Sequence, residues 1–183
     1  MLGLAIGLAG CGEAGGQQKK DSRVTQLDRT LWQTIDALAQ QIPFSKAKVE
    51  TVLGVGLVDR DTSNDVFPNM NTGRQDFEGG PVKLSDGVVI VKIDLRTRLQ
   101  KAHPGFLVLN FAGACIDLDA VRAHYDDLKI TGYPRGSSLD EVTAYSAFLT
   151  WGKLNFGFRE RNPDCLAGVS FDPKTPEAGN INK

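Results

Sequence analysis

The sequence predicts an α+β domain in which two or three helices pack on one face of an antiparallel sheet. Apolar residues recur at helical spacing in only two blocks, 23–54 and 116–128. Elsewhere apolar and polar residues alternate with a period of two, and runs of β-branched residues occur. Strands therefore follow one another in meanders, which is the α+β arrangement. With 183 residues, of which 41% are hydrophobic, the chain can build one core, and we expect a single domain over 23–172.

Two helices are expected in the first block. The first spans about 23–41 and stops before Pro43. Its apolar residues stand three or four positions apart: Val24, Leu27, Leu31, Ile35, Leu38 and Ile42. The second helix lies in the segment PFSKAKVETVLG, which carries terminal signals at both ends. These are the Ser45 N-cap, the Phe44–Val49 staple and the Gly54 C-cap.

The remaining elements are eight strands, a third helix, a long loop and a tail. Strands are expected at 55–59, 77–84, 87–96, 106–113, 129–133, 141–151, 153–160 and 165–172. The third helix, 116–128, repeats the staple and cap of the second, with Ile116, Asp117 and Val121. Turn residues fill the loop 61–76, and the tail 173–183 is expected to be disordered. Cap spacing and element order suggest two repeated units, each a helix followed by a meander.

The amino-terminal segment predicts where in the cell the protein is located. Residues 1–10 form an apolar run of the length of a signal-peptide core, too short to span a bilayer. The run ends in Leu8-Ala9-Gly10-Cys11, which resembles the lipobox of bacterial lipoproteins. This resemblance implies that the leader is removed and that Cys11 is lipidated, with 11–22 as a flexible tether. Gly12 stands where that family's inner-membrane retention signal has Asp, which favours the outer membrane, facing the periplasm.

The leader departs from the lipoprotein pattern because it has no Lys or Arg before Cys11. Two explanations stay open: the natural start lies upstream, or the leader is unusually short. A buried N-terminal strand is the alternative to a leader.

The element order from about 24 to 172 is loosely similar to that of small bacterial envelope lipoproteins with a fold like that of β-lactamase inhibitor proteins. This resemblance implies helices on a curved antiparallel sheet.

Cys115 and Cys165 are an even pair once Cys11 is assigned to lipid. In an oxidising compartment the simplest interpretation is a disulfide closing a loop of about fifty residues. The alternatives are two buried thiols, or a catalytic cysteine that uses His103 or His124.

Composition and motifs exclude several classes of function. A net charge of -1 and a pI of about 6.1 argue against a nucleic-acid surface. The histidines occupy no metal-ligand spacing, and no nucleotide-binding or hydrolase motif occurs, so no cofactor is predicted. The alternating oxygen donors Asp59, Asp61, Ser63 and Asp65 are a weak calcium candidate, since the loop's glycine and final glutamate are missing.

Aromatic and arginine side chains in the late strands suggest an interface. Tyr145, Trp151, Arg159 and Arg161 are of the residue types that anchor protein contacts, although core packing is the alternative for the aromatic pair.

The sequence as a whole favours a lipid-anchored, periplasm-facing, non-enzymatic binding protein. One such role is an inhibitor or immunity protein against a toxin or hydrolase. The expected partners are the membrane, through the anchor, and another protein. Two other functions stay open: a structural or assembly lipoprotein of the outer membrane, and an envelope hydrolase whose site is not local in sequence.

Overall fold

The computed structural model describes residues 24–60, 73–99 and 103–175 as one extended sheet with three short helices. The helices are α1 (Leu31–Ala39), α2 (Lys46–Leu53) and α3 (Leu118–His124). The strands are β1 (Thr25–Gln26), β2 (Val58–Asp59), β3 (Arg74–Gly79), β4 (Val82–Lys83), β5 (Val88–Arg98), β6 (Phe106–Gly113), β7 (Lys129–Gly132), β8 (Val142–Leu149), β9 (Gly152–Arg159) and β10 (Asn162–Pro173). Of the described residues, 46% lie in strands and 18% in helices, so the fold is richer in sheet than the predicted α+β layout.

The sheet is open and mixed. Its strands lie in the order β1-β4-β5-β6-β10-β9-β8-β7, with β3 also paired to β5 and β2 to β3. Two runs of antiparallel strands meet where β6 pairs with β10. The predicted antiparallel sheet is confirmed only in part, because β1 runs parallel to β4 at one edge. The chain between β1 and β4 forms α1, α2, β2 and β3, and this long connection lets the two strands run in the same direction.

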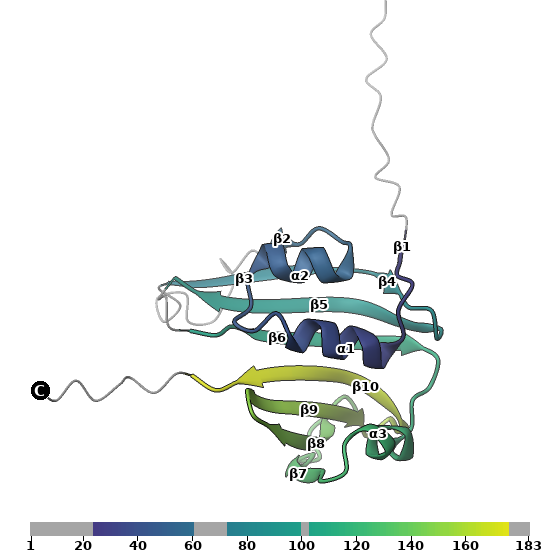
Figure 1. Cartoon of the computed structure of the whole chain (residues 1–183). Helices are drawn as coiled ribbons and strands as arrows, with labels where there is room; N and C mark the ends of the chain where they lie inside the picture. Colours follow the sequence, from purple (N-terminus) through teal and green to yellow (C-terminus); the bar gives the residue numbers. More distant parts are fainter. Residues whose placement is uncertain (1–23, 61–72, 100–102, 176–183) are drawn as a thin grey trace, which may run out of the picture.

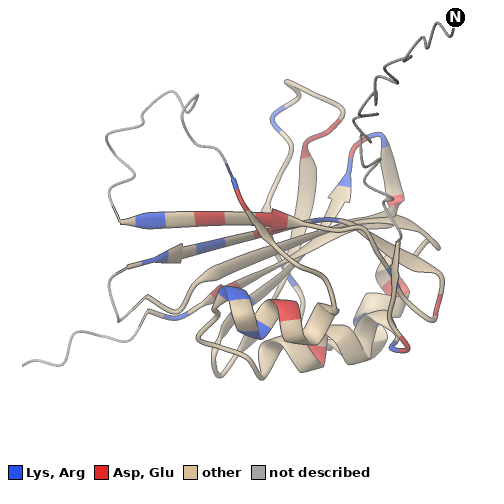
Figure 2. Ribbon diagram, turned by 90° about the horizontal axis from the view of Figure 1, so that it is seen from above, with Lys and Arg blue, Asp and Glu red and all other residues tan. Residues whose placement is uncertain are grey.

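The helices cover one side of the sheet (Figure 1), and the view from above shows α1 and α2 lying along that side (Figure 2). Their buried residues, such as Leu31, Ile35 and Val121, join one core with alternate residues of the strands. Phe156 and Phe171 are the largest of the fully buried side chains in that core. The side chains on this face of the sheet are therefore buried in the core beneath the helices.

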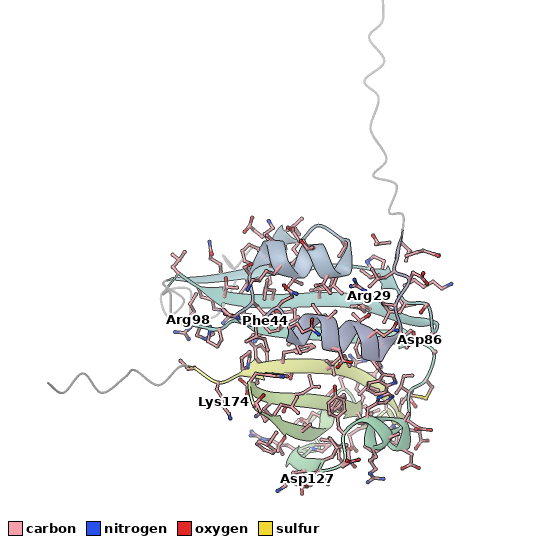
Figure 3. All side chains as sticks on the ribbon, in the orientation of Figure 1. Arg29, Phe44, Asp86, Arg98, Asp127 and Lys174 are labelled. Atoms are coloured by element: carbon pink, nitrogen blue, oxygen red, sulfur yellow. A yellow bond between two sulfur atoms is a disulfide. The ribbon has the colours of Figure 1, made fainter. Side chains whose placement is uncertain are left out.

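The first helix is shorter than the pattern predicted. Its capping box is formed by Thr30 and Gln33, and residues 25–26 are strand instead. The backbone N–H of Leu27 donates to the carbonyl of Lys83 at 2.9 Å. The backbone of this segment is therefore bonded to the sheet and not to a further turn of helix. Asp86, in the β4–β5 turn, accepts the N–H of Leu31 at 2.6 Å and fixes the start of α1. Figure 3 shows Asp86 at this end of the sheet.

The second helix matches its prediction closely. Ser45 accepts the N–H of Lys48, and Gly54 ends the helix in the left-handed conformation at φ 64°. Asp117 caps α3 as expected, but that helix ends at His124 because Tyr125 adopts an extended conformation.

The predicted strand 77–84 is divided into β3 and β4. Pro81 has no N–H to donate, and Gly80 before it has a φ of 109°, so the edge strand bends between the two pieces. The strand predicted at 55–59 shrinks to β2. Residues 74–76 of the predicted loop belong to β3, and 61–72 lie outside the described residues.

The last strand extends past its predicted end at 172. Pro173 is buried in β10, and Lys174 donates its N–H to the carbonyl of Trp151 at 2.9 Å. Residues 176–183 of the predicted disordered tail lie outside the described residues.

An aromatic cluster joins two helices to the sheet. Trp32 of α1 stacks on His124 of α3 with ring centroids 4.0 Å apart, and both Trp32 and Tyr125 contact Phe156 of β9. Burial, with a contribution from the negative charge of Asp36, raises the pKa of Tyr125 to about 12.

Candidate functional site

The face of the sheet opposite the helices has no helical cover in the described part of the chain. Side chains alternate between faces along a strand, so Val108 and Asn110 point away from the side on which Leu107 and Leu109 are buried. Register places Val108 beside Ser170, and from there the same face continues across β9 and β8. We call this surface the open face.

Small residues leave a hollow in the open face. Ala144, Gly157, Gly168 and Asn110 occupy consecutive strands in one row. A Cβ on Gly168 would lie 2.6 Å from the carbonyl oxygen of Leu109, so a larger residue cannot be placed there without moving β6. The hollow has a volume of about 160 Å³, and Val108, Val142 and Arg159 also contribute to its walls.

Arg159 is the charged group of this hollow. Arg159 is half-buried, and its side chain forms no hydrogen bond or ion pair with any residue that the structure describes. It also borders a second hollow of about 250 Å³ beside the Cys115–Cys165 pair. Arg161, in contrast, is exposed and bound to Asp140 at 2.6 Å. A partly desolvated guanidinium with free donors is suited to an incoming carboxylate or other acceptor.

A row of polar side chains stiffens the open face beside the hollow. The hydroxyl of Ser146 donates to Asn155 Oδ1 at 2.6 Å, and Asn155 Nδ2 donates to Ser170 Oγ at 2.9 Å. Thr131 of β7 adds a hydroxyl contact to Ser146. This row links four strands side by side, and because the acceptor of Ser146 is an amide oxygen, the contact supplies no base to activate that hydroxyl.

The other end of the open face carries charges on β3 and β5, visible as neighbouring blue and red segments in Figure 2. Arg96 binds Asp94 through two hydrogen bonds, Nε to Oδ1 at 2.9 Å and Nη2 to Oδ2 at 3.0 Å. Arg74 binds Asp76 at 2.6 Å. Burial disfavours the Asp94 carboxylate, but the Arg96 hydrogen bond and nearby positive charges outweigh it and lower the pKa of Asp94.

We expect Asp94→Asn to lower the free energy of unfolding by about 1–2 kcal/mol at pH 7. Because the folded-state pKa of Asp94 lies below its ordinary value of 3.8, its charged form stabilises the fold above pH 3.8. That contribution is lost as the pH falls through the lower, folded-state pKa. The difference in free energy of unfolding between the natural chain and Asp94→Asn should therefore shrink in that pH range. Urea unfolding at pH 7 and at successive lower pH values measures it. Asp172→Asn, which removes the more exposed partner of Lys153, is the control and should have a smaller effect. A difference independent of pH would contradict this assignment.

The structure separates the four predicted interface residues. Tyr145 packs edge-on against the buried Phe158 at 5.7 Å, and Trp151 stacks on the buried Phe171 at 6.0 Å. These two aromatic side chains therefore lie against the helix-covered core. Arg159 and Arg161 lie together near the hollows.

Sequence reasoning missed the apolar residues exposed near the hollow. Tyr133 and Leu139, in the β7–β8 connection, are 70% and 66% exposed, and Val142 lines the hollow itself. Leu139 lies beside Arg161, because its carbonyl accepts the N–H of Arg161 at 3.0 Å, and Arg161 lines the hollow next to the cysteine pair. The strand parity of Val142 relative to the core residue Ala147 was the available signal.

The sulfur atoms of Cys115 and Cys165 lie 1.92 Å apart, at disulfide distance. Cys11 lies outside the described residues, as do Asp61, Ser63 and Asp65 of the calcium candidate, whereas Asp59 is exposed in β2. Within 24–60, 73–99 and 103–175, no group of three or more His, Cys, Asp or Glu side chains is placed to hold a metal ion. Over the same ranges, each helix is too short or too polar to cross a membrane.

No protein-family model, curated protein or solved structure matches this chain.

Proposed function

We propose that this chain is a lipid-anchored, non-enzymatic binding protein of the bacterial envelope whose open face contacts another protein. The lipobox-like segment at Cys11 supports the anchor and an outer-membrane position facing the periplasm. The Cys115–Cys165 pair suits an oxidising compartment. An inhibitor or immunity protein against a toxin or hydrolase is the role that we favour.

The observation that carries this proposal is the hollow at Arg159. It combines apolar walls, a floor of small residues and a half-buried guanidinium without a partner among the described residues. In the β7–β8 connection, exposed Tyr133 follows Gly132, which is paired with Ala144 of the hollow, and exposed Leu139 is bonded to Arg161. Arginine and aromatic side chains around an apolar centre are the composition of energetically dominant interface sites. A partner side chain that ends in a carboxylate would fill the hollow and pair with Arg159.

The likeness to the fold of β-lactamase inhibitor proteins is part of the same proposal. The meander that ends in β6 and the meander that ends in β10 pair through their last strands, which supports two repeated units. A two-unit sheet would offer one continuous surface to a partner.

Site-specific photo-crosslinking in intact cells tests the proposal. A photoreactive residue at Val142, on the open face, should give a discrete protein adduct in the membrane fraction. The same residue at Ala47, exposed on α2, should not. Arg159→Glu should remove the Val142 adduct, whereas Arg122→Glu, on the exposed side of α3, should leave it. Cys11→Ala should move both protein and adduct to the soluble fraction.

Equal adducts at Val142 and Ala47, or no change with Arg159→Glu in a folded variant, would contradict docking on the open face. Uncrosslinked Cys11→Ala protein that stays in the membrane fraction would contradict the anchor. If the adduct protein is a toxin or hydrolase encoded beside this chain, the inhibitor role is supported. An adduct with an outer-membrane assembly component would favour the alternative.

A further inference from the structure

A third hollow lies at the far end of the open face, where β3 begins and β5 ends. Its volume is about 290 Å³. Its walls are Arg74, Arg96, Thr97, Arg98, His103 and Phe106. The three arginines lie on two paired strands, and none of the described residues that line the hollow is a carboxylate.

The pairing of β3 with β5 places Arg74 directly opposite Arg98. Like charges at opposed positions of neighbouring strands destabilise a sheet. The ion pair with Asp76 offsets part of the repulsion at Arg74, and Asp94 forms an ion pair with Arg96. Arg98 has no such partner among the described residues, and none of these residues uses its guanidinium donors.

His103 adds a donor on the third side of the hollow. Its Nδ1 accepts the backbone N–H of Gly105 at 3.0 Å, so in the neutral imidazole the proton is on Nε2. Phe106 contributes an apolar ring, over which the Arg96 guanidinium lies at 5.6 Å from the centroid. The arginine and histidine nitrogens of the lining that are not already bonded are therefore donors, and they come from two strands and a turn.

We propose that this hollow binds a phosphate group carried on a larger molecule. A planar carboxylate offers one edge, which a single arginine satisfies, whereas a phosphate presents oxygens in several directions to donors converging from different elements. Bound phosphate would offset the repulsion between Arg74 and Arg98. The volume exceeds that of phosphate alone, which leaves room for the group attached to it against Phe106.

Two sources could supply this chemistry: a soluble phosphate ester or the headgroup of a phospholipid.

The site is remote from the start of the described chain. β1 lies beside β4, which pairs with Val89, and Arg98 is nine residues further along β5, a distance of about 30 Å. Figure 3 shows Arg98 at the opposite end of the sheet from Arg29 and Asp86.

Calorimetric titration with inorganic phosphate and with glycerol 3-phosphate tests the site. The unlipidated Cys11→Ala chain is used, so that an anchor cannot contribute. We expect saturable binding with both probes, tighter for the ester. Arg98→Ala should weaken it at least about tenfold, since charge-assisted bonds are lost. Arg122→Ala, at an exposed helix position, is the matched control and should change nothing.

Vesicles of phosphatidylglycerol distinguish the two sources. Cosedimentation that is lost in Arg98→Ala assigns the site to a lipid headgroup, and binding of the soluble probes without cosedimentation assigns it to a soluble ester. Absence of saturable binding to every probe would overturn the proposal, as would binding unchanged by both Arg98→Ala and Arg74→Gln in variants that keep the melting temperature. Neither result bears on Arg159, which is tested separately by crosslinking.

Discussion

Replacing Phe156 by alanine is expected to lower the free energy of unfolding by about 3–5 kcal/mol. The side chain is 0% exposed at the centre of β9. It contacts Tyr125 at 5.1 Å and Trp32 at 6.5 Å between ring centroids, so it supports both α1 and α3 on the sheet. Truncation removes its buried apolar surface and leaves a cavity that three different elements would have to close. Urea unfolding monitored by circular dichroism measures the loss.

Phe148→Ala is the matched control for this substitution. Phe148 lies on β8, in the same hairpin as Phe156, but it is 61% exposed. Its truncation should change the free energy of unfolding by about 0.5 kcal/mol or less. Similar losses for the two variants would mean that the side of the sheet covered by the helices has been assigned wrongly.

Local signals in the sequence predicted the parts of the fold that local interactions decide. The Ser45 and Asp117 caps and the Gly54 terminus depend on neighbours within four residues, and the structure has them as predicted. The start of α1 was misplaced because it depends on Asp86, which is 55 residues away from Leu31 in the chain. Apolar spacing at Val24 and Leu27 fits a helix equally well, and only the pairing with β4 decides against it.

The candidate site shows the same division. Residue type alone suggests Arg159, Tyr145 and Trp151 together, whereas the structure places Arg159 at the hollow and the two aromatic side chains against the core. Strand parity alone does not say which face the helices cover. The opposition of Arg74 and Arg98 arises from the register of β3 on β5, which pairs residues with 23 others between them, and the sequence carries no local signal for it.

Removing the Cys115–Cys165 bond by a double substitution to serine should lower the free energy of unfolding by about 4 kcal/mol. The two residues are 50 positions apart, so in the chain-entropy account the bond removes much of the freedom of the unfolded chain. The folded site should change little. The N–H of Leu166 donates to the carbonyl of Ile116 at 2.8 Å, and this backbone bond keeps the two segments together without the sulfur atoms.

The origin of this stabilisation can be measured. If it acts through the unfolded chain, the double variant should expose more surface on unfolding, and its urea slope should increase along with the fall in midpoint. A reducing agent should destabilise the natural chain to the level of the double variant and leave that variant unchanged. Cys11→Ser should keep both the stability and the response to reduction. A natural chain that is indifferent to reduction would contradict the bond, and with it one support for an oxidising compartment.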